Sequence, residues 1–397
     1  MARPRKSQLS REILVERALA LVPKIRGRAP ECDAERQLPD STRQDLRELG
    51  LARVLQPRLF GGAEAPFGGM VEVLNTVGSG CGSTAWALAQ YIGHNFMVSQ
   101  WPERAQREIW GQDEKALFAG ILIPSLGKAK KVRGGYELTG RWPFVSGVTA
   151  CDWCILSGMV EKTEGPSEER YFLARKDQLN ILDTWNTMGL IGSGSHDVEV
   201  ESLFFPSHLT LPIKHLKGGE SPGRKIHRAP MYRSPSYMTF GLLISSASVG
   251  IAVGMVRDYV KLAKTQVALM SGKKALSEAT NQIRISRATV TVEAAQALLH
   301  QNCREIMNLL ETDKKLPSNE KRTKFRAAGA MAGTLALEAG NLIWDAGGGR
   351  GVYLNNPLAR AYRDLCAATR HMTHSWDLNG VTHGSVRLGL PLQNPSL

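Results

Sequence analysis

The sequence lacks most of the short motifs by which enzymes are identified. Its 397 residues contain no Walker loop, no Gly-x-Gly-x-x-Gly directly after an expected strand, and no Gly-x-Ser-x-Gly between an expected strand and helix; the one Gly-x-Ser-x-Gly, Gly219–Gly223, lies in a linker rich in Gly, Pro and basic residues. These absences argue against a serine hydrolase, a P-loop NTPase and a Rossmann dehydrogenase. His-Glu-x-x-His and Glu-x-x-His are absent too, so a zinc peptidase or a carboxylate-bridged di-iron site is not expected. We therefore expect no metal.

Cysteine is scarce: six residues are scattered along the chain, and Cys151 and Cys154 form the single Cys-x-x-Cys. In a strand these two side chains would point to opposite faces, which disfavours a shared zinc or redox site. No secretory apolar segment follows the basic N-terminus. We therefore expect free thiols in a reducing, cytoplasmic compartment.

Acidic residues are outnumbered, and the formal charge is +13. Basic residues are dense only in Met1–Lys6 and Lys128–Arg133, and neither run is interleaved with aromatic residues. A nucleic-acid platform would combine the two. We therefore expect no nucleic-acid partner, and the charge is compatible with an ordinary soluble enzyme.

Long apolar runs are also rare. The exception is Met238–Val256, nineteen residues without a charge, which is long enough to span a membrane. It is isolated and rich in serine and glycine, and helix-like sequence follows it. A buried central helix is the favoured interpretation, and no membrane association is expected.

The order of patterns along the chain predicts an α+β protein of three parts. Residues 1–115 are expected to form an N-terminal helical domain, within which Pro23 ends the first helix. Residues 116–216 show short strand-like runs separated by turn signals and predict a central β-barrel or sandwich domain. Residues 217–397 are expected to form a linker and a C-terminal four-helix bundle, ending with a helix over Pro357–Asn379.

The stretch Gly134–Gly158 contains the most distinctive strand pattern. Trp142 and Phe144 lie two residues apart, so in a strand they would point the same way. Ser146 and Gly147 then offer a hydroxyl and open backbone at the strand end. Such a set suits a flat aromatic cofactor, although a half-buried hairpin with core aromatics has the same pattern.

Histidines are the other candidates for chemistry. His371 and His374 are three apart on the expected last helix and would share a face, and His94 follows a glycine on an otherwise apolar helix. Each could act as a base or orient a substrate hydroxyl, or could be an ordinary packed histidine. The loop Gly347–Gly351 could bring backbone amides and an arginine to an anionic group, or could simply join two helices.

Taken together, four segments resemble the acyl-CoA dehydrogenase superfamily over nearly the whole chain. The segments are Leu38–Gly62, Gly134–Gly147 and Asp183–Pro206, together with a late Arg363-Asp364 that precedes His371. The last of these, and the run Gly82–Asn95, resemble the oxygenase components of two-component flavin-dependent monooxygenases. That branch includes hydroxylases of p-hydroxyphenylacetate and of phenolic seco-steroids, and the dibenzothiophene monooxygenase. The alternative within the superfamily is an acyl-CoA dehydrogenase with tightly bound FAD. Its usual glutamate and long-helix arginine have no counterpart here, where Lys264–Lys273 stands instead.

The resemblance implies a monooxygenase that hydroxylates a small aromatic, phenolic or indolic substrate. Reduced FMN or FAD would come from a separate NAD(P)H:flavin reductase, and O2 would react with it to give a C4a-(hydro)peroxide. A homotetramer is implied as well. The implied catalytic residues are His371, Ser146 and His94. The implied flavin-binding residues are Trp86, Trp142, Phe144, Val145, Ser146, Gly147, Gly349, Arg350, His371 and Met372.

Overall fold

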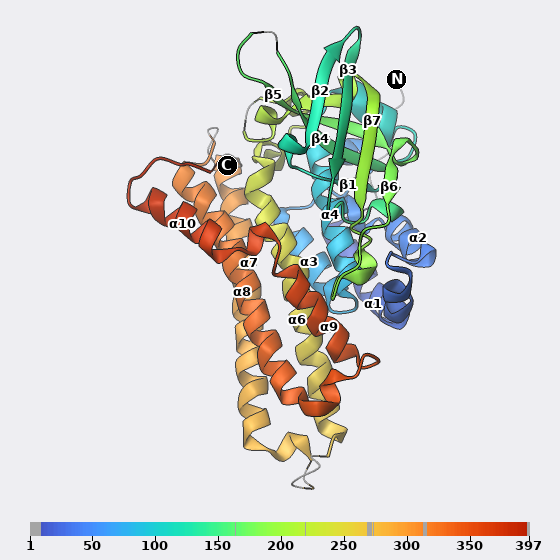
Figure 1. Cartoon of the computed structure of the whole chain (residues 1–397). Coiled ribbons are helices and arrows are strands. Elements are labelled where there is room, and N and C mark those ends of the chain that lie inside the picture. The colour runs from blue at the N-terminus through green and yellow to red at the C-terminus, as the bar shows by residue number, and fades with distance from the viewer. Residues whose placement is uncertain are drawn as a thin grey trace.

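Helices, then strands, then helices follow one another along the chain (Figure 1). The computed structural model describes residues 9–162, 164–218, 220–267, 272, 274–312 and 316–394. The basic run Met1–Lys6 and Lys273 lie outside these residues. The helices are α1 (Arg11–Glu35), α2 (Asp40–Leu49), α3 (Phe67–Gly78), α4 (Gly82–Val98), α5 (Glu103–Trp110), α6 (Ser236–Thr265), α7 (Ala279–Thr312), α8 (Asn319–Gly347), α9 (Pro357–Ala368) and α10 (Trp376–Arg387).

The strands are β1 (Phe118–Gly120), β2 (Gly127–Val132), β3 (Gly135–Trp142), β4 (Trp153–Val160), β5 (Glu168–Arg175), β6 (Asn180–Leu182), β7 (Asp197–Pro206) and β8 (Thr210–Pro212). They form one sheet in the order β6-β7-β3-β2-β4-β5-β8, with β1 paired to β4. The pairs β1–β4 and β2–β4 are parallel and the others antiparallel. The sequence missed β2 because it is rich in lysine, yet Ala129 is buried between the exposed Lys128 and Lys130.

The expectation that Pro23 ends the first helix is wrong. Helix α1 continues to Glu35 with Pro23 and Pro30 inside it. Each proline removes one backbone hydrogen bond, but an apolar stripe continues on both sides of Pro23, with Leu14 and Leu21 before it and Ile25 after it, all buried. Packing of this stripe against the helical core therefore outweighs the local cost.

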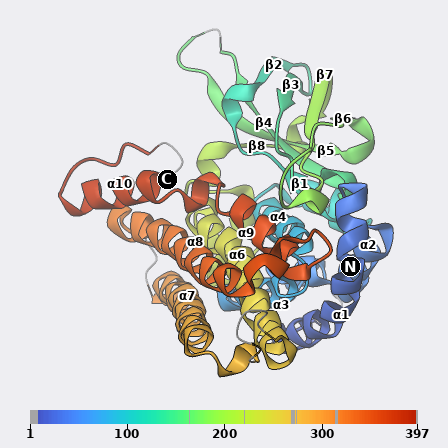
Figure 2. The same cartoon turned by 60° about the horizontal axis from the view of Figure 1, so that its bottom comes forward.

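Helix α4 lies at the centre of the molecule and positions several of the candidate site residues. Every residue from Gly82 to Val98 is buried, as expected for a helix that is apolar all round. It packs against α6 and β1, and both views show it directly below the sheet (Figures 1 and 2). Trp86 and His94 therefore project from a rigid, water-excluded element.

The long uncharged segment forms the core of the C-terminal bundle. Helix α6 contains it and packs against α8 and α3, and α7 packs against α8. By length and hydropathy α6 could cross a membrane, but 94% of its most apolar window is buried inside the protein. Among the described residues it is the one helix of this kind, and its burial agrees with the expected central helix.

The expected last helix over Pro357–Asn379 is wrong in its middle. Helix α9 ends at Ala368, a 3-10 turn covers Met372–His374, and α10 begins at Trp376. Ser375 caps α10 by accepting a hydrogen bond from the backbone N–H of Leu378. His371 and His374 therefore lie in a turn between two helices rather than on one helix face, and α10 extends away from the body along α8 (Figures 1 and 2).

Candidate functional site

Ser146, which follows β3, is hydrogen-bonded to α4 and to the loop before β7. Its hydroxyl accepts a hydrogen bond from the indole Nε1 of Trp86 on α4 at 3.1 Å. It accepts a second from the hydroxyl of Ser195 at 2.8 Å. The ring of Trp86 in turn meets His371 edge to face, with 5.6 Å between ring centroids. The structure therefore brings together Trp86, Ser146 and His371, which are far apart in the sequence.

Trp142 and Phe144 do not point the same way, contrary to expectation. Strand β3 ends at Trp142, whose fully buried indole donates to the carbonyl oxygen of Ser157 at 2.9 Å. Phe144 has a left-handed backbone with φ of +62° and is 64% exposed. This conformation is uncommon for a bulky residue and turns the ring outward beside Ser146. Phe144 thus offers an accessible aromatic face, whereas Trp142 belongs to the core.

The backbone at Val145 and Gly147 is hydrogen-bonded to α4 and to the loop before β7. The hydroxyl of Tyr91 donates to the carbonyl oxygen of Gly147 at 2.8 Å, and the N–H of Val145 donates to the carbonyl oxygen of His196 at 3.0 Å. Gly147 has φ of +75°, and a Cβ there would lie 2.5 Å from the Tyr91 hydroxyl. Only glycine permits this close approach.

His371 is a neutral imidazole in a defined tautomer. Its Nδ1 accepts the backbone N–H of Thr373 at 3.2 Å, so in the neutral ring the hydrogen is on Nε2. Burial, with a smaller contribution from the positive charge of Arg326, lowers its pKa to about 4. Near neutral pH His371 therefore presents an N–H donor from Nε2. Met372, the next residue, is 51% exposed.

His94 has the opposite arrangement. Its Nδ1 lies 3.1 Å from the carbonyl oxygen of Phe118, and because a carbonyl only accepts, Nδ1 carries the hydrogen. Burial lowers the pKa to about 4. The lone pair on Nε2 is buried and has no hydrogen-bond partner within the described residues. It lies against Gly120, where a Cβ would come within 2.9 Å of it, and the ring packs on Phe240.

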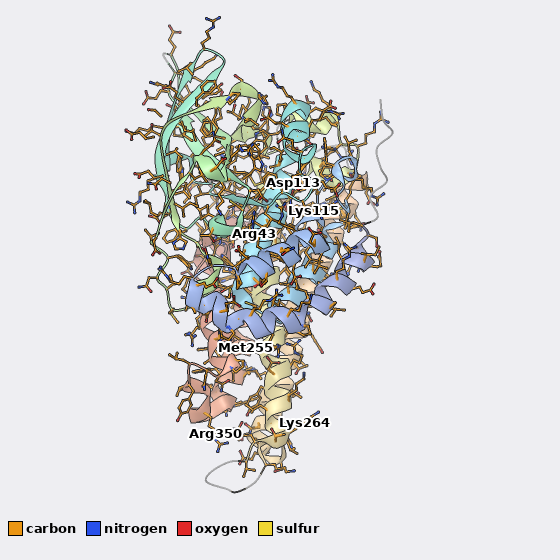
Figure 3. All side chains as sticks on the ribbon, turned by 90° about the vertical axis from the view of Figure 1, so that its right-hand side faces the viewer. Arg43, Asp113, Lys115, Met255, Lys264 and Arg350 are labelled. Carbon is orange, nitrogen blue, oxygen red and sulfur yellow. The ribbon has the colours of Figure 1, made fainter. Side chains whose placement is uncertain are left out.

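Gly349 and Arg350 are not brought to this site. They line an open cavity of about 600 Å³ at the far end of the bundle, together with Tyr259, Gln266 and Arg284. Figure 3 shows Arg350 and Lys264 at that end, well away from Arg43, Asp113 and Lys115. Gly349 and Arg350 precede α9, whereas His371 follows it. Because α9 has 12 residues, its two ends are about 18 Å apart.

Three residues of interest had not been singled out from the sequence. Ser193 and Ser195 lie in a Gly-Ser-Gly-Ser turn within the segment Asp183–Pro206 that carries the family resemblance, which assigned neither serine a role, and their hydroxyls are 2.7 Å apart. Arg284 lines the bundle-end cavity, whereas Lys264 is exposed. Nothing in the local sequence around Arg284 distinguishes it from other surface arginines on a long helix.

The described residues contain no group of three or more histidine, cysteine or acidic side chains that could hold a metal ion. Cys151 and Cys154 are free and buried. The residues around Ser146 do fit a flavin. Phe144 supplies an exposed aromatic face and Ser146 a hydroxyl, and the contact of Gly147 with Tyr91 fixes the backbone that carries them.

Comparison with known proteins identifies the fold and the family. Residues 242–376 match the family "Acyl-CoA dehydrogenase, C-terminal domain". The crystal structure of 3-HSA hydroxylase from Rhodococcus sp. RHA1 superposes with a TM-score of 0.92 at 30% identity, covering 97% of this chain and 99% of that one. The architecture is thus that of the acyl-CoA dehydrogenase superfamily, with its helical, β and bundle parts, as the sequence predicted.

Two characterised relatives narrow the assignment. The oxygenase subunit HsaA of a flavin-dependent monooxygenase from Rhodococcus jostii is 30% identical, over 95% of this chain and 99% of its own length. The oxygenase component of an FADH2-dependent resorcinol hydroxylase from Rhizobium sp. is 28% identical, over 95% and 94%. The chain belongs to the oxygenase components of the two-component flavin-dependent monooxygenases. It is therefore a flavin-dependent oxidoreductase, and the alternative of an acyl-CoA dehydrogenase is not supported.

Proposed function

We propose that this protein hydroxylates a small phenolic or indolic substrate with O2 and with reduced FMN or FAD delivered by a separate NAD(P)H:flavin reductase. The observation that carries the substrate class is the buried Nε2 lone pair of His94, which has no donor among the described residues. An unpaired buried acceptor is costly, and a neutral O–H or N–H of a ligand would satisfy it. A phenol or an indole brings such a donor on an aromatic ring.

His94 would act as a hydrogen-bond acceptor rather than as a full base at rest. With a pKa of about 4 His94 does not deprotonate a free phenol. Its hydrogen bond with the substrate O–H becomes stronger, however, as that O–H becomes more acidic while the aromatic ring attacks oxygen. This is general-base assistance in the transition state. The surrounding burial, with Phe240 packed on the ring, excludes competing water.

His371 supports the opposite role. The family resemblance implies that His371 either deprotonates a phenol or stabilises activated oxygen at the flavin. The hydrogen bond from the Thr373 N–H fixes the neutral tautomer with hydrogen on Nε2, so we assign His371 as a donor to oxygen at the flavin. A positioned donor near developing negative charge is an effective electrostatic catalyst.

The flavin would lie against Phe144 and Ser146, with Trp86 and His371 beside it. When bound, reduced flavin supplies the electrons that activate O2. Ser146 would hold N5 through its hydroxyl, and Val145 and Gly147 would keep it in place through their backbone hydrogen bonds to His196 and Tyr91. Met372 would lie at the edge next to His371, where its exposure leaves it accessible.

Gly349 and Arg350 would contribute from another copy of the chain. Within one chain they lie at the opposite end of α9 from His371. Large apolar side chains are exposed on α10, directly after it and in the segment before α9, among them Val381, Leu388 and Leu354. Burial of such side chains between copies would stabilise an assembly. We propose the homotetramer implied by the resemblance, with Arg350 and Arg284 at the flavin phosphates.

The function is tested by supplying the purified protein with a generic flavin reductase, NADH, and FMN or FAD in parallel. A panel of phenols, indoles and matched non-hydroxylated arenes is offered under 18O2. We expect a mass increase of one 18O atom in a phenol or indole and not in the arenes. Two results would contradict the proposal: product formed without the oxygenase, or the absence of product from every phenol and indole in the panel.

A further inference from the structure

The first turn of α6 lies beside the ring of His94. Tyr237 and Phe240 are three residues apart on this helix, so their side chains share a face. Both are partly exposed, whereas the other three residues of this turn are buried. Phe240 packs on His94 with 5.7 Å between ring centroids, and Tyr237 is about 4.5 Å further along the helix axis. The side chain of Tyr237 is therefore within reach of a substituent on a ring that His94 holds by its O–H.

The hydroxyl of Tyr237 has a hydrogen to offer. It is hydrogen-bonded to the hydroxyl of Tyr171 on β5, and within the described residues this is the one hydrogen bond that either hydroxyl makes. One of the two hydrogens lies between the oxygens, so the other needs an acceptor elsewhere. Tyr171 is 0% exposed and Tyr237 is partly exposed. Because a fully buried donor without an acceptor is costly, Tyr171 donates to Tyr237, and the hydrogen of Tyr237 is left for a ligand.

Arg326 on α8 adds positive charge to this region. Its side chain is buried, and its backbone lies against α6, where a Cβ at Gly241 would come within 4.0 Å of the Arg326 Cα. Its Nε donates to Oδ1 of Asn379 at 3.2 Å. Burial lowers the pKa of His371, and the charge of Arg326 lowers it further. Burial raises the pKa of Tyr237, and the same charge opposes that rise. The guanidinium thus makes the region near both residues favourable for negative charge.

We propose that Tyr237 is a specificity-determining residue, which donates a hydrogen bond to an oxygen acceptor on the substituent of an aromatic substrate that His94 holds by its O–H or N–H. The inference rests on the proposed function and narrows its substrate class to phenols and indoles that carry a carboxylate or a carbonyl group. The charge of Arg326 favours the carboxylate. Glu169, the carboxylate that acts on Tyr237, pairs with Lys217 at 2.8 Å and opposes this preference only weakly.

The test compares the affinities of three phenols of matched length: p-hydroxyphenylpropionate, its methyl ketone analogue and p-butylphenol. Isothermal titration calorimetry measures each dissociation constant for the protein loaded with oxidised FMN or FAD. The alkyl chain would displace water from Tyr237 and leave its hydrogen without an acceptor. We expect the wild-type protein to bind the carboxylate about tenfold, and the ketone about threefold, more tightly than p-butylphenol.

Tyr237→Phe should weaken binding of the carboxylate about tenfold and of the ketone about threefold, and should leave p-butylphenol within about twofold. Tyr171→Phe keeps the O–H of Tyr237 and should keep the preference. Because Tyr237→Phe leaves the buried O–H of Tyr171 without an acceptor, the double variant Tyr171→Phe/Tyr237→Phe is measured as well. It orphans no hydroxyl and should lose the preference as Tyr237→Phe does.

Tyr362→Phe is the matched control. Its hydroxyl donates to Oδ1 of Asn341, which is about 22 Å along α8 from Arg326, so all three dissociation constants should stay unchanged. Three results would each overturn the inference: no preference in the wild-type protein, a Tyr237→Phe variant that weakens all three phenols equally or none of them, or loss of the preference in Tyr171→Phe alone. Labelled product in the oxygenase screen would still uphold the proposed function in these cases, and its absence from every phenol and indole would overturn both.

Discussion

The two histidines of the site have the same charge but opposite hydrogen-bonding roles. His94 holds its hydrogen on Nδ1 against a backbone carbonyl and leaves Nε2 as an acceptor. His371 accepts a backbone N–H at Nδ1 and offers Nε2–H. A substrate hydroxyl and an activated oxygen need these two different partners. The backbone contacts thus give the two rings different hydrogen-bonding roles, as the proposed function requires.

Replacement of His371 by alanine should reduce hydroxylated product by about a hundredfold or more, since a positioned hydrogen-bond or proton-transfer group contributes at least this much. Flavin affinity should stay within about threefold, because other residues carry the contact area. Product by mass and H2O2 by a coupled assay measure the split. His208→Ala, at a partly buried histidine paired with Glu108, is the control. Undiminished product in His371→Ala would refute its role.

The burial of His94 also predicts a pH effect on stability. Its pKa falls from 6.5 in the unfolded chain to about 4 in the folded protein, so the unfolded state takes up a proton first as pH falls. The free energy of unfolding therefore decreases from about pH 6.5 downward. His94→Gln should remove about 2 kcal/mol of the loss between pH 7.5 and pH 5. Urea unfolding at both pH values measures this, and equal losses in both proteins would contradict it.

The sequence identified His94, Ser146 and His371 as candidates because each stands in a pattern or a resemblance. It could not give their partners. The outward turn of Phe144 depends on a left-handed backbone, and the contact of Trp86 with Ser146 joins residues 60 apart in the chain. Strand periodicity alone therefore predicted that Phe144 and Trp142 point to the same face, and in the structure they do not.

At the scale of elements, α9 connects the histidine turn to α4 and to the loop around Leu190. Asp364 on α9 is buried and accepts the backbone N–H of Leu190 at 2.7 Å. It also lies against the start of α4, where a Cβ at Gly82 would come within 2.6 Å of its Oδ2. Burial, with smaller contributions from Cys81 and Asp33, raises the pKa of this carboxyl well above its usual value. The side chain thus links α9 to the loop around Leu190 and to the start of α4.

Asp364→Asn should accordingly be tolerated, with a change of about 1 kcal/mol or less in the free energy of unfolding, because the amide oxygen still accepts from Leu190. Asp364→Ala should cost about 2 kcal/mol, since it orphans the Leu190 N–H and leaves a void. Chemical denaturation of both variants decides the matter. A larger loss in the asparagine variant than in the alanine variant would show that the negative charge is needed.

Elements with strong periodicity were the most predictable. The three long C-terminal helices are where the sequence indicated, because their apolar faces are long. Strand β2 was not predicted because lysines fill its exposed face. The first helix was predicted to end at Pro23 because the sequence does not show the packing that extends α1 beyond it. The turn at residues 369–375 broke an expected helix because capping by His371 and Ser375 stabilises an interruption that helix periodicity does not reveal.

At the scale of the whole molecule, the exposed apolar side chains of α10 need a partner. Val381 on α10 is 71% exposed and Leu388, directly after α10, is 83% exposed. Helix α10 leaves the body of the chain (Figure 2). A second copy would cover them and could bring Arg350 toward a flavin site. The three-domain division remains a prediction at this scale, with helices ending at Trp110 and resuming at Ser236.

Light scattering during gel filtration should give the mass of a tetramer for the wild-type protein. Val381→Glu places a charge where burial is expected and should shift the population to smaller species, with weaker flavin binding. Glu16→Ala, at an exposed residue of α1, should leave the mass unchanged. A wild-type monomer that binds flavin with full affinity would contradict both the assembly and the role of Arg350.

The most direct test of the account is rapid mixing of the anaerobic, reduced-flavin-loaded protein with O2 and a phenol that has been turned over in the screen. A monooxygenase should show a long-lived intermediate that is spectrally distinct from reduced and oxidised flavin, and close to one hydroxylated product per flavin oxidised. Direct return to oxidised flavin without an intermediate, with all oxygen recovered as H2O2, would contradict it.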